Sequence, residues 1–205
     1  ERPVRTLADL PPARAYLFDV TPRQFLEIAG TRLRGRYRRQ LEGYRYGHGI
    51  FKVDYALSGA VPWTNPQAHR TTTLHLVGSF GELRANEEAL ADARVPEHPL
   101  VIAAQPAVAD RSRAPAGQHT LWAYCHVPNG STVDMTARIE AQIDRFAPGW
   151  RDLVLARSAM NSRDYESYDE NYVGGDIAGG AAGGMQLLFR PVLRWNPYST
   201  AIEGM

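Results

Sequence analysis

The sequence of 205 residues is poor in cysteine and in long apolar runs. Cys125 is the only cysteine, so no disulfide can form within the chain, which favours a reducing compartment such as the cytoplasm. No stretch approaches the ~18 consecutive apolar residues that a membrane-spanning helix needs. The first residues lack the basic and apolar regions of a signal peptide. From these absences we expect a cytoplasmic protein.

Several motifs that would identify an enzyme class are also missing. Gly47 and Gly49 are followed by Lys52 where the third glycine of a GxGxxG fingerprint would stand. The sequence contains no HExxH, CxxC or GxSxG motif. Its six histidines include no pair four residues apart, so we expect no metal site. A net charge of +1 gives no whole-chain field to attract nucleic acid.

The basic residues are nearly all arginine, since Lys52 is the only lysine, and five arginines lie within eight residues at positions 32, 34, 36, 38 and 39. A solvated helix face is the simplest interpretation of this run. Peripheral membrane contact is an alternative if the substrate is lipid-like. A nucleic-acid site is the least favoured reading, because no binding motif or stacking aromatic residues accompany the arginines.

Periodicity predicts strands and helices in an irregular order. Strands are predicted at 15–18, 51–57, 72–77, 100–104, 119–127 and 153–160, and helices at 22–29, 32–41, 80–93 and around 139–146. Thr21 with Pro22 and Ser79 with Glu82 are helix-start signals. Because strands and helices do not alternate strictly, we predict an α+β fold with a mixed β-sheet flanked by helices.

Five polar residues interrupt otherwise apolar strands, namely Lys52, Asp54, His75, Tyr124 and His126. Each one alone is more typical of a solvated strand residue than of a catalyst. If their strands pair in one sheet, they would together line a polar-edged cavity. The glycine-rich stretch after Asn171 likewise has two interpretations, a flexible loop or a close backbone approach to a ligand.

Six segments carry a resemblance to a known family, in the same order along almost the whole chain. They are 46–57 with 61–63, 119–128, 139–143, 146–149, 171–177, and 186–191 with its Q-x-x-x-R-P pattern. These segments resemble bacterial phytoene-dehydrogenase-like flavoproteins of the amine-oxidase and carotenoid-desaturase superfamily. The resemblance implies an FAD-dependent oxidoreductase with a flavin domain and an α+β substrate domain, whose sheet roofs an apolar cavity above the flavin.

The resemblance also implies a division of the chain and a set of site residues. Residues 1–20 would be a remnant of the FAD-binding domain with its last strand, 21–170 the substrate-binding domain, and 171–205 the return toward the FAD domain. Gly174, Gly175 and Asp176 would lie nearest the flavin. Any catalytic acid or base would come from Lys52, Asp54, Tyr124 or His126, whereas Arg190 would be structural and bond carbonyls.

The chain departs from the family at both ends. It lacks the N-terminal dinucleotide fingerprint, and it stops at residues 202–205, where the family continues into a glycine-rich flavin segment. We therefore expect a fragment that does not retain FAD and is inactive alone. Its expected partners are a hydrophobic small molecule and the remainder of its own FAD-binding domain, with self-association through the surface that this domain would cover.

The alternative function is a non-catalytic module that binds a hydrophobic ligand or a protein without flavin. Under the leading hypothesis, the substrate is an isoprenoid- or carotenoid-like molecule, and the reaction of the parent enzyme would be dehydrogenation, desaturation or redox isomerisation. The electron acceptor does not follow from the residues.

Overall fold

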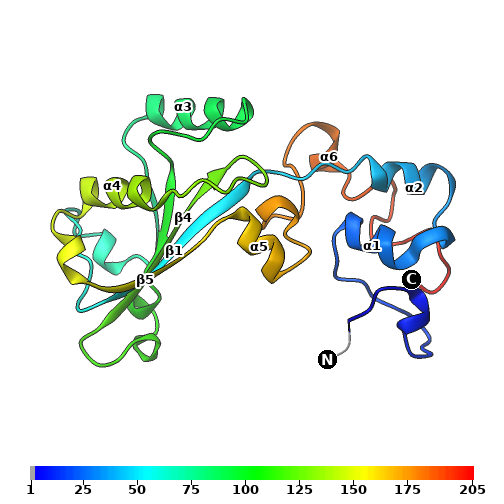
Figure 1. Cartoon of the computed structure of the whole chain (residues 1–205), viewed down its shortest axis with the longest axis horizontal. Coiled ribbons are helices and arrows are strands. Elements are labelled where there is room, and N and C mark those ends of the chain that lie inside the picture. The colour runs from blue at the N-terminus through cyan, green and yellow to red at the C-terminus, as the bar shows by residue number, and fades with distance from the viewer. Residues whose placement is uncertain (1–2) are drawn as a thin grey trace.

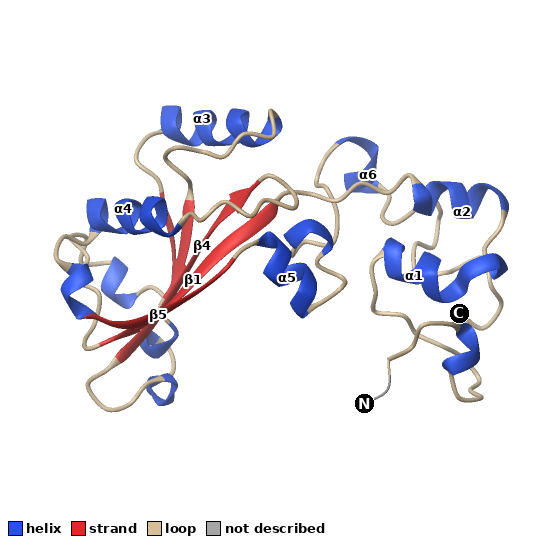
Figure 2. Ribbon diagram, viewed as in Figure 1, coloured by secondary structure: helices blue, strands red, loops and turns tan. Residues whose placement is uncertain are grey.

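The computed structural model describes residues 3–205 and has two unequal parts (Figure 1). A β-sheet with its flanking helices forms one end of the molecule. Helices α1 and α2 form the other end, together with the first and the last residues that the structure describes (Figures 1 and 2). The segment that leads into the first strand and the segment after α5 connect the two parts.

The sheet has the strand order β2-β3-β4-β1-β5, and every neighbouring pair is antiparallel. The strands are β1 Gly49–Leu57, β2 Thr73–Leu76, β3 Val101–Ala104, β4 His119–Val127 and β5 Val154–Met160. The predicted α+β class is confirmed, but the sheet is antiparallel rather than mixed. Strands β4 and β5 do run in the same direction, joined by a helical crossover, yet β1 lies between them and pairs with both.

Residues 3–205 form six α-helices, of which some flank the sheet and others build the smaller part. They are α1 Pro22–Ala29, α2 Gly35–Glu42, α3 Phe80–Ala91, α4 Thr136–Phe146, α5 Ser162–Tyr168 and α6 Gly184–Leu188. The predicted helix starts hold in position: Pro22 opens α1, and the Ser79 hydroxyl accepts a hydrogen bond from the Glu82 backbone at the start of α3. The Thr21 side chain, however, makes no capping hydrogen bond. Helices α5 and α6 were not predicted, because both are short and neither shows an apolar period.

The predicted strand at 15–18 is wrong. These residues form no regular element, and the Leu17 side chain is 98% exposed. The backbone N–H of Tyr16 donates to the carbonyl of Gly204, but no strand runs alongside this segment among residues 3–205. An apolar run becomes a strand only where a neighbour completes the hydrogen-bond ladder.

The main core lies on one face of the sheet. Val53 and Ala123 from the central strands pack with Ile139 and Ile143 of α4, and all four side chains are fully buried. Burying an isoleucine or valine side chain stabilises the fold by about 1.5–3 kcal/mol. Because strand side chains alternate, this buried face fixes which residues of β1 and β4 must point to the other side.

A second, smaller core holds the helical part together. Phe25 and Ala29 of α1 and Leu41 of α2 pack against Val192 and Ile202 from the C-terminal segment. The two cores share no residue. The division of the chain at 1–20, 21–170 and 171–205 stays a prediction. Among the described helices, none has both the length and the apolar character needed to cross a membrane.

Candidate functional site

The sheet face opposite the main core brings the predicted catalytic candidates together. On β1, Lys52 and Asp54 lie opposite Tyr124 and Trp122 of β4, and Ile50 lies opposite His126. His75 of β2 reaches the same face through Ile102, which pairs with both His75 and Tyr124. We call this surface the open face. It comprises Lys52, Asp54, His75, Trp122, Tyr124 and His126.

Helices bound the open face without covering it. In Figure 1, α4 lies on the core side of the sheet and α5 on the other side. Tyr165 of α5 interacts electrostatically with Asp54, and Glu87 of α3 interacts electrostatically with His126. Between these margins the side chains of Lys52 and Asp54 remain 24% and 48% exposed. The open face is therefore a partly desolvated surface that a ligand can reach.

Lys52 and Asp54 neutralise each other. The Lys52 ammonium donates to both carboxylate oxygens of Asp54 and stands 5.7 Å from the centre of the Trp122 ring. Residues two apart on a strand share a face, which makes this pair a direct result of the β1 pleat. A carboxylate held in this way is a poor general base, because its lone pairs already accept the ammonium protons.

A row of rings runs along β4 and past its end. Trp122 stacks on Tyr124 with ring centroids 6.0 Å apart, and Tyr124 meets His126 edge-on at 5.8 Å. His48, just before β1, extends the row with its ring 6.4 Å from that of His126. Sequence reasoning included neither Trp122 nor His48 among the site residues, although the β4 alternation already placed Trp122 on this face.

Burial sets the protonation of this row. It raises the pKa of Tyr124, so the phenol stays neutral. Burial also lowers the pKa of His126, with a smaller contribution from neighbouring His48, so the imidazole is neutral near pH 7. Cys125 points into the opposite core, where burial raises the pKa of its thiol to about 12 and makes it a poor nucleophile. The open face therefore offers aromatic surface and neutral polar groups.

The predicted flavin-side residues Gly174, Gly175 and Asp176 are buried where three segments meet. The Asp176 carboxylate accepts hydrogen bonds from the backbone N–H groups of Gly47 at 2.6 Å and Ala178 at 2.8 Å. Asn129 donates to the carbonyls of Gly47 and Val173. We call this junction the glycine corner, and its Gly47 immediately precedes His48 of the ring row.

Glycine is needed at this corner because chain segments approach closely. A β-carbon on Gly174 would lie 1.9 Å from Asn129 Oδ1, and one on Gly49 would lie 2.3 Å from Ser162 Oγ. The close contacts are between parts of the same chain, and the backbone approach to a ligand that the sequence suggested stays a prediction. The nearness of Gly174, Gly175 and Asp176 to a flavin stays a prediction.

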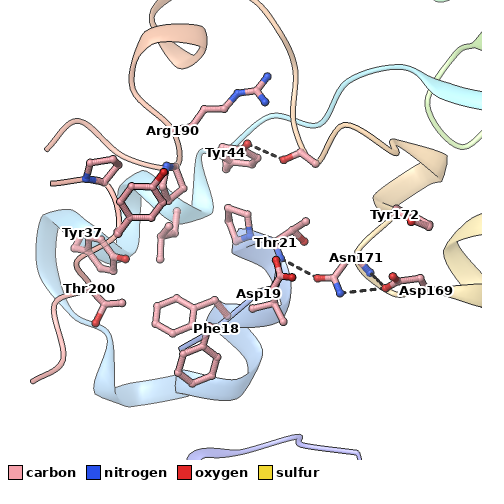
Figure 3. Close-up of a pocket in the computed structure, with 18 residues that line it drawn as sticks. Phe18, Asp19, Thr21, Tyr37, Tyr44, Asp169, Asn171, Tyr172, Arg190 and Thr200 are labelled. Carbon is pink, nitrogen blue, oxygen red and sulfur yellow. Dashed lines mark hydrogen bonds between the residues drawn. The ribbon is translucent and has the colours of Figure 1, made fainter. Parts of the chain in front are cut away.

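A cavity of about 490 Å³ lies in the helical part, away from the open face (Figure 3). Its walls come from residues 18–25, from the end of α2, from 169–172 and from the C-terminal segment. Arg190 lines its edge and donates to the carbonyl of Gly180 at 3.0 Å, as predicted for a structural arginine. No sequence signal indicated the cavity, because its walls are distant along the chain.

A comparison with models of protein families finds no match to the chain, and a comparison with curated proteins finds no significant match.

Proposed function

We propose that this chain is the substrate-binding portion of an FAD-dependent, phytoene-dehydrogenase-like oxidoreductase that acts on a hydrophobic, isoprenoid- or carotenoid-like substrate. The observation that carries the proposal is the open face, a sheet surface that is lined by stacked rings and left uncovered between α3 and α5. A soluble domain usually covers or solvates such a surface, and an accessible aromatic one marks a binding site.

The shape of the ring row suits an extended, flat ligand. Trp122, Tyr124 and His126 occur at every second position of β4, so their side chains stand in line along one strand. Aromatic groups of this kind bind unsaturated chains by stacking and by burying apolar area. The mutually neutralised Lys52 and Asp54 add little cost to the approach of an apolar ligand, since their charges are already paired.

In the proposed enzyme the protein residues bind and orient the substrate. Neutral Tyr124 and His126 can hydrogen-bond a polar end group or hold a proton, and the packed rings limit the access of water. Bound FAD would supply hydride acceptance, which is the chemistry that this class of cofactor carries. No residue of the open face is set up as a strong base or a nucleophile.

The residues of this chain could contact the ring system of FAD, but those that the structure describes do not form a site for its pyrophosphate. A flat ring system could lie against the open face, but the pyrophosphate needs a glycine-rich turn that leads from a strand into a helix N-terminus. Helix α6 follows the glycine-rich stretch, yet it has 5 residues and follows no strand. Within residues 3–205 no other helix starts from such a turn, so the proposal assigns the phosphate site to sequence outside these residues.

The test is flavin reduction in a protein expressed from the complete reading frame. Under anaerobic conditions, an all-trans polyene should bleach the visible flavin absorbance, and Tyr124→Ala should slow this bleaching by roughly tenfold through lost stacking. Trp195→Ala is the control, because this exposed side chain lies in the helical part. Absence of any bound flavin, or equal rates in Tyr124→Ala and the parent, would contradict the proposal.

A second candidate function is a flavin-independent module that binds a hydrophobic ligand. It is favoured by the observation that the described residues form an aromatic surface but no phosphate site. The same experiment separates the two functions. Saturable polyene binding to a colourless full-length protein would support the module and exclude the oxidoreductase.

A further inference from the structure

We propose that the cavity in the helical part is a binding site for a small organic cation with an apolar body, such as an amine or a quaternary ammonium compound. This site is separate from the open face and requires no flavin. Its volume of about 490 Å³ is in the range of small-molecule pockets.

Six of the 18 residues that line the cavity are aromatic. Phe18 and Phe25 pack edge to face with centroids 5.0 Å apart, and Tyr37, Tyr44 and Tyr198 contribute further rings. Figure 3 shows the labelled aromatic residues around this space. Ring faces carry negative electrostatic potential, so several of them around one cavity attract a cation that also has apolar surface.

One of these rings, that of Tyr37, already contacts a cation in the protein. The guanidinium of Arg194, which does not line the cavity, stands 5.0 Å from the centre of the Tyr37 ring. A wall ring of this cavity therefore already makes a cation–π contact with the protein's own arginine.

Two carboxylates, those of Asp19 and Asp169, line the cavity. Asp19 lines the space and is exposed, and its carboxylate receives no hydrogen bond or ion pair from the rest of residues 3–205. Asp169 also lines it, accepting from the backbone N–H and the side-chain amide of Asn171. A cation would gain a direct partner in Asp19.

Arg190, the one basic residue in the lining, does not make this an anion site. Its Nη2 donates to the Gly180 carbonyl, and its Nε is buried and out of reach of a ligand. In Figure 3 the guanidinium lies at the edge of the cavity beside Tyr44. An anion entering the cavity would meet the Asp19 carboxylate and the ring faces, both of which repel it.

The experiment compares three probes of similar size by calorimetric titration of the 205-residue chain: benzyltrimethylammonium, benzyl alcohol and benzoate. The cation should bind at least about fivefold more tightly than the neutral alcohol, and benzoate should bind least. Comparable affinities for all three probes, or no binding of the cation, would overturn the inference.

Two variants locate the site. Asp19→Asn and Tyr198→Leu should each weaken binding of benzyltrimethylammonium by about fivefold. Both side chains are exposed, so neither change should disturb folding, which circular dichroism would verify. Asp152→Asn, an exposed carboxylate beside the sheet, is the charge-matched control and should leave the affinity unchanged. An equal loss of affinity in Asp152→Asn and Asp19→Asn would show that binding of the cation depends only on net charge, and it would overturn the inference.

Discussion

At the scale of single residues, the Asp176 carboxylate shows how a buried charge holds separate segments together. It is 1% exposed and accepts the backbone N–H groups of Gly47 and Ala178. Charge-assisted hydrogen bonds of this kind are roughly twice as strong as neutral ones. The sequence marked Asp176 as unusual through its glycine neighbours, but its partner Gly47 is 129 positions away, and no local pattern reports such a contact.

Removing this carboxylate should destabilise the whole fold. Asp176→Ala leaves two backbone donors without a partner in a buried place, so we expect the free energy of unfolding to fall by about 2–4 kcal/mol. Urea denaturation followed by circular dichroism measures the change. Asp110→Ala is the control, since Asp110 also accepts a backbone N–H but is exposed, and its loss should be much smaller.

The glycine corner gives a second prediction, with a control that has the same backbone angle. Gly174 and Gly35 both have φ of 63°, but only Gly174 has neighbours within 4 Å of an added β-carbon. Alanine at either position costs about 1 kcal/mol for the left-handed backbone. Gly174→Ala should cost about 1–3 kcal/mol more from overlap with Asn129. Equal melting temperatures for the two variants would disprove the close contact.

His126 gives a pH dependence whose sign follows from its lowered pKa. Because burial lowers the pKa in the folded state, His126 contributes stability that is present above its unfolded pKa of about 6.5 and lost as the pH falls through the folded pKa. The free energy of unfolding should therefore drop between about pH 7 and pH 5, and His126→Gln should reduce that drop. His75→Gln, at an exposed position, should leave the drop unchanged.

At the scale of secondary structure, an element could be predicted where its apolar and polar side chains follow a clear period. Strand β4 was predicted from His119 to Val127, as observed, because every second side chain from Leu121 to Val127 is apolar. Helix α5 was missed because its start depends on a capping box between Asn161 and Asp164, followed by mostly polar residues. The prediction that Lys52 and Tyr124 lie on one face required their two strands to pair in one sheet. The sequence alone does not show which strands pair.

Helix α4 is fixed to the sheet by a buried acid as well as by its apolar face. Glu140 is 6% exposed and accepts hydrogen bonds from Arg151 before β5 and from Arg157 within it. This arrangement connects the core helix to the edge strand beside β1, and thereby supports the sheet that carries the open face.

Breaking this connection should loosen the edge of the sheet. Glu140→Gln removes the charge that both arginines share, and we expect the free energy of unfolding to fall by about 1–3 kcal/mol. Asp144→Asn is the matched control, because Asp144 binds Arg151 alone and is 37% exposed, so its loss should be under about 1 kcal/mol. Similar losses in the two variants, measured by urea denaturation, would contradict a special role for Glu140.

At the scale of the whole molecule, two hydrophobic cores support two distinct surfaces. The sheet core leaves the open face accessible, and the helical core supports the aromatic cavity. The helical part also exposes the apolar side chains of Leu17, Leu188 and Trp195. Self-association and contact with an FAD-binding domain through this surface stay predictions, as does membrane contact by the arginine run. No local pattern could have predicted that the two chain ends share one core.

The affinity of the 205-residue chain for all-trans-retinol tests most directly whether the open face is a binding surface for hydrophobic ligands. Titration followed by retinol fluorescence should show saturable binding. Trp122→Ala should weaken this binding by about fivefold, whereas Trp195→Ala should not change it. Equal affinities in the parent chain and Trp122→Ala, or a loss confined to Trp195→Ala, would contradict the account.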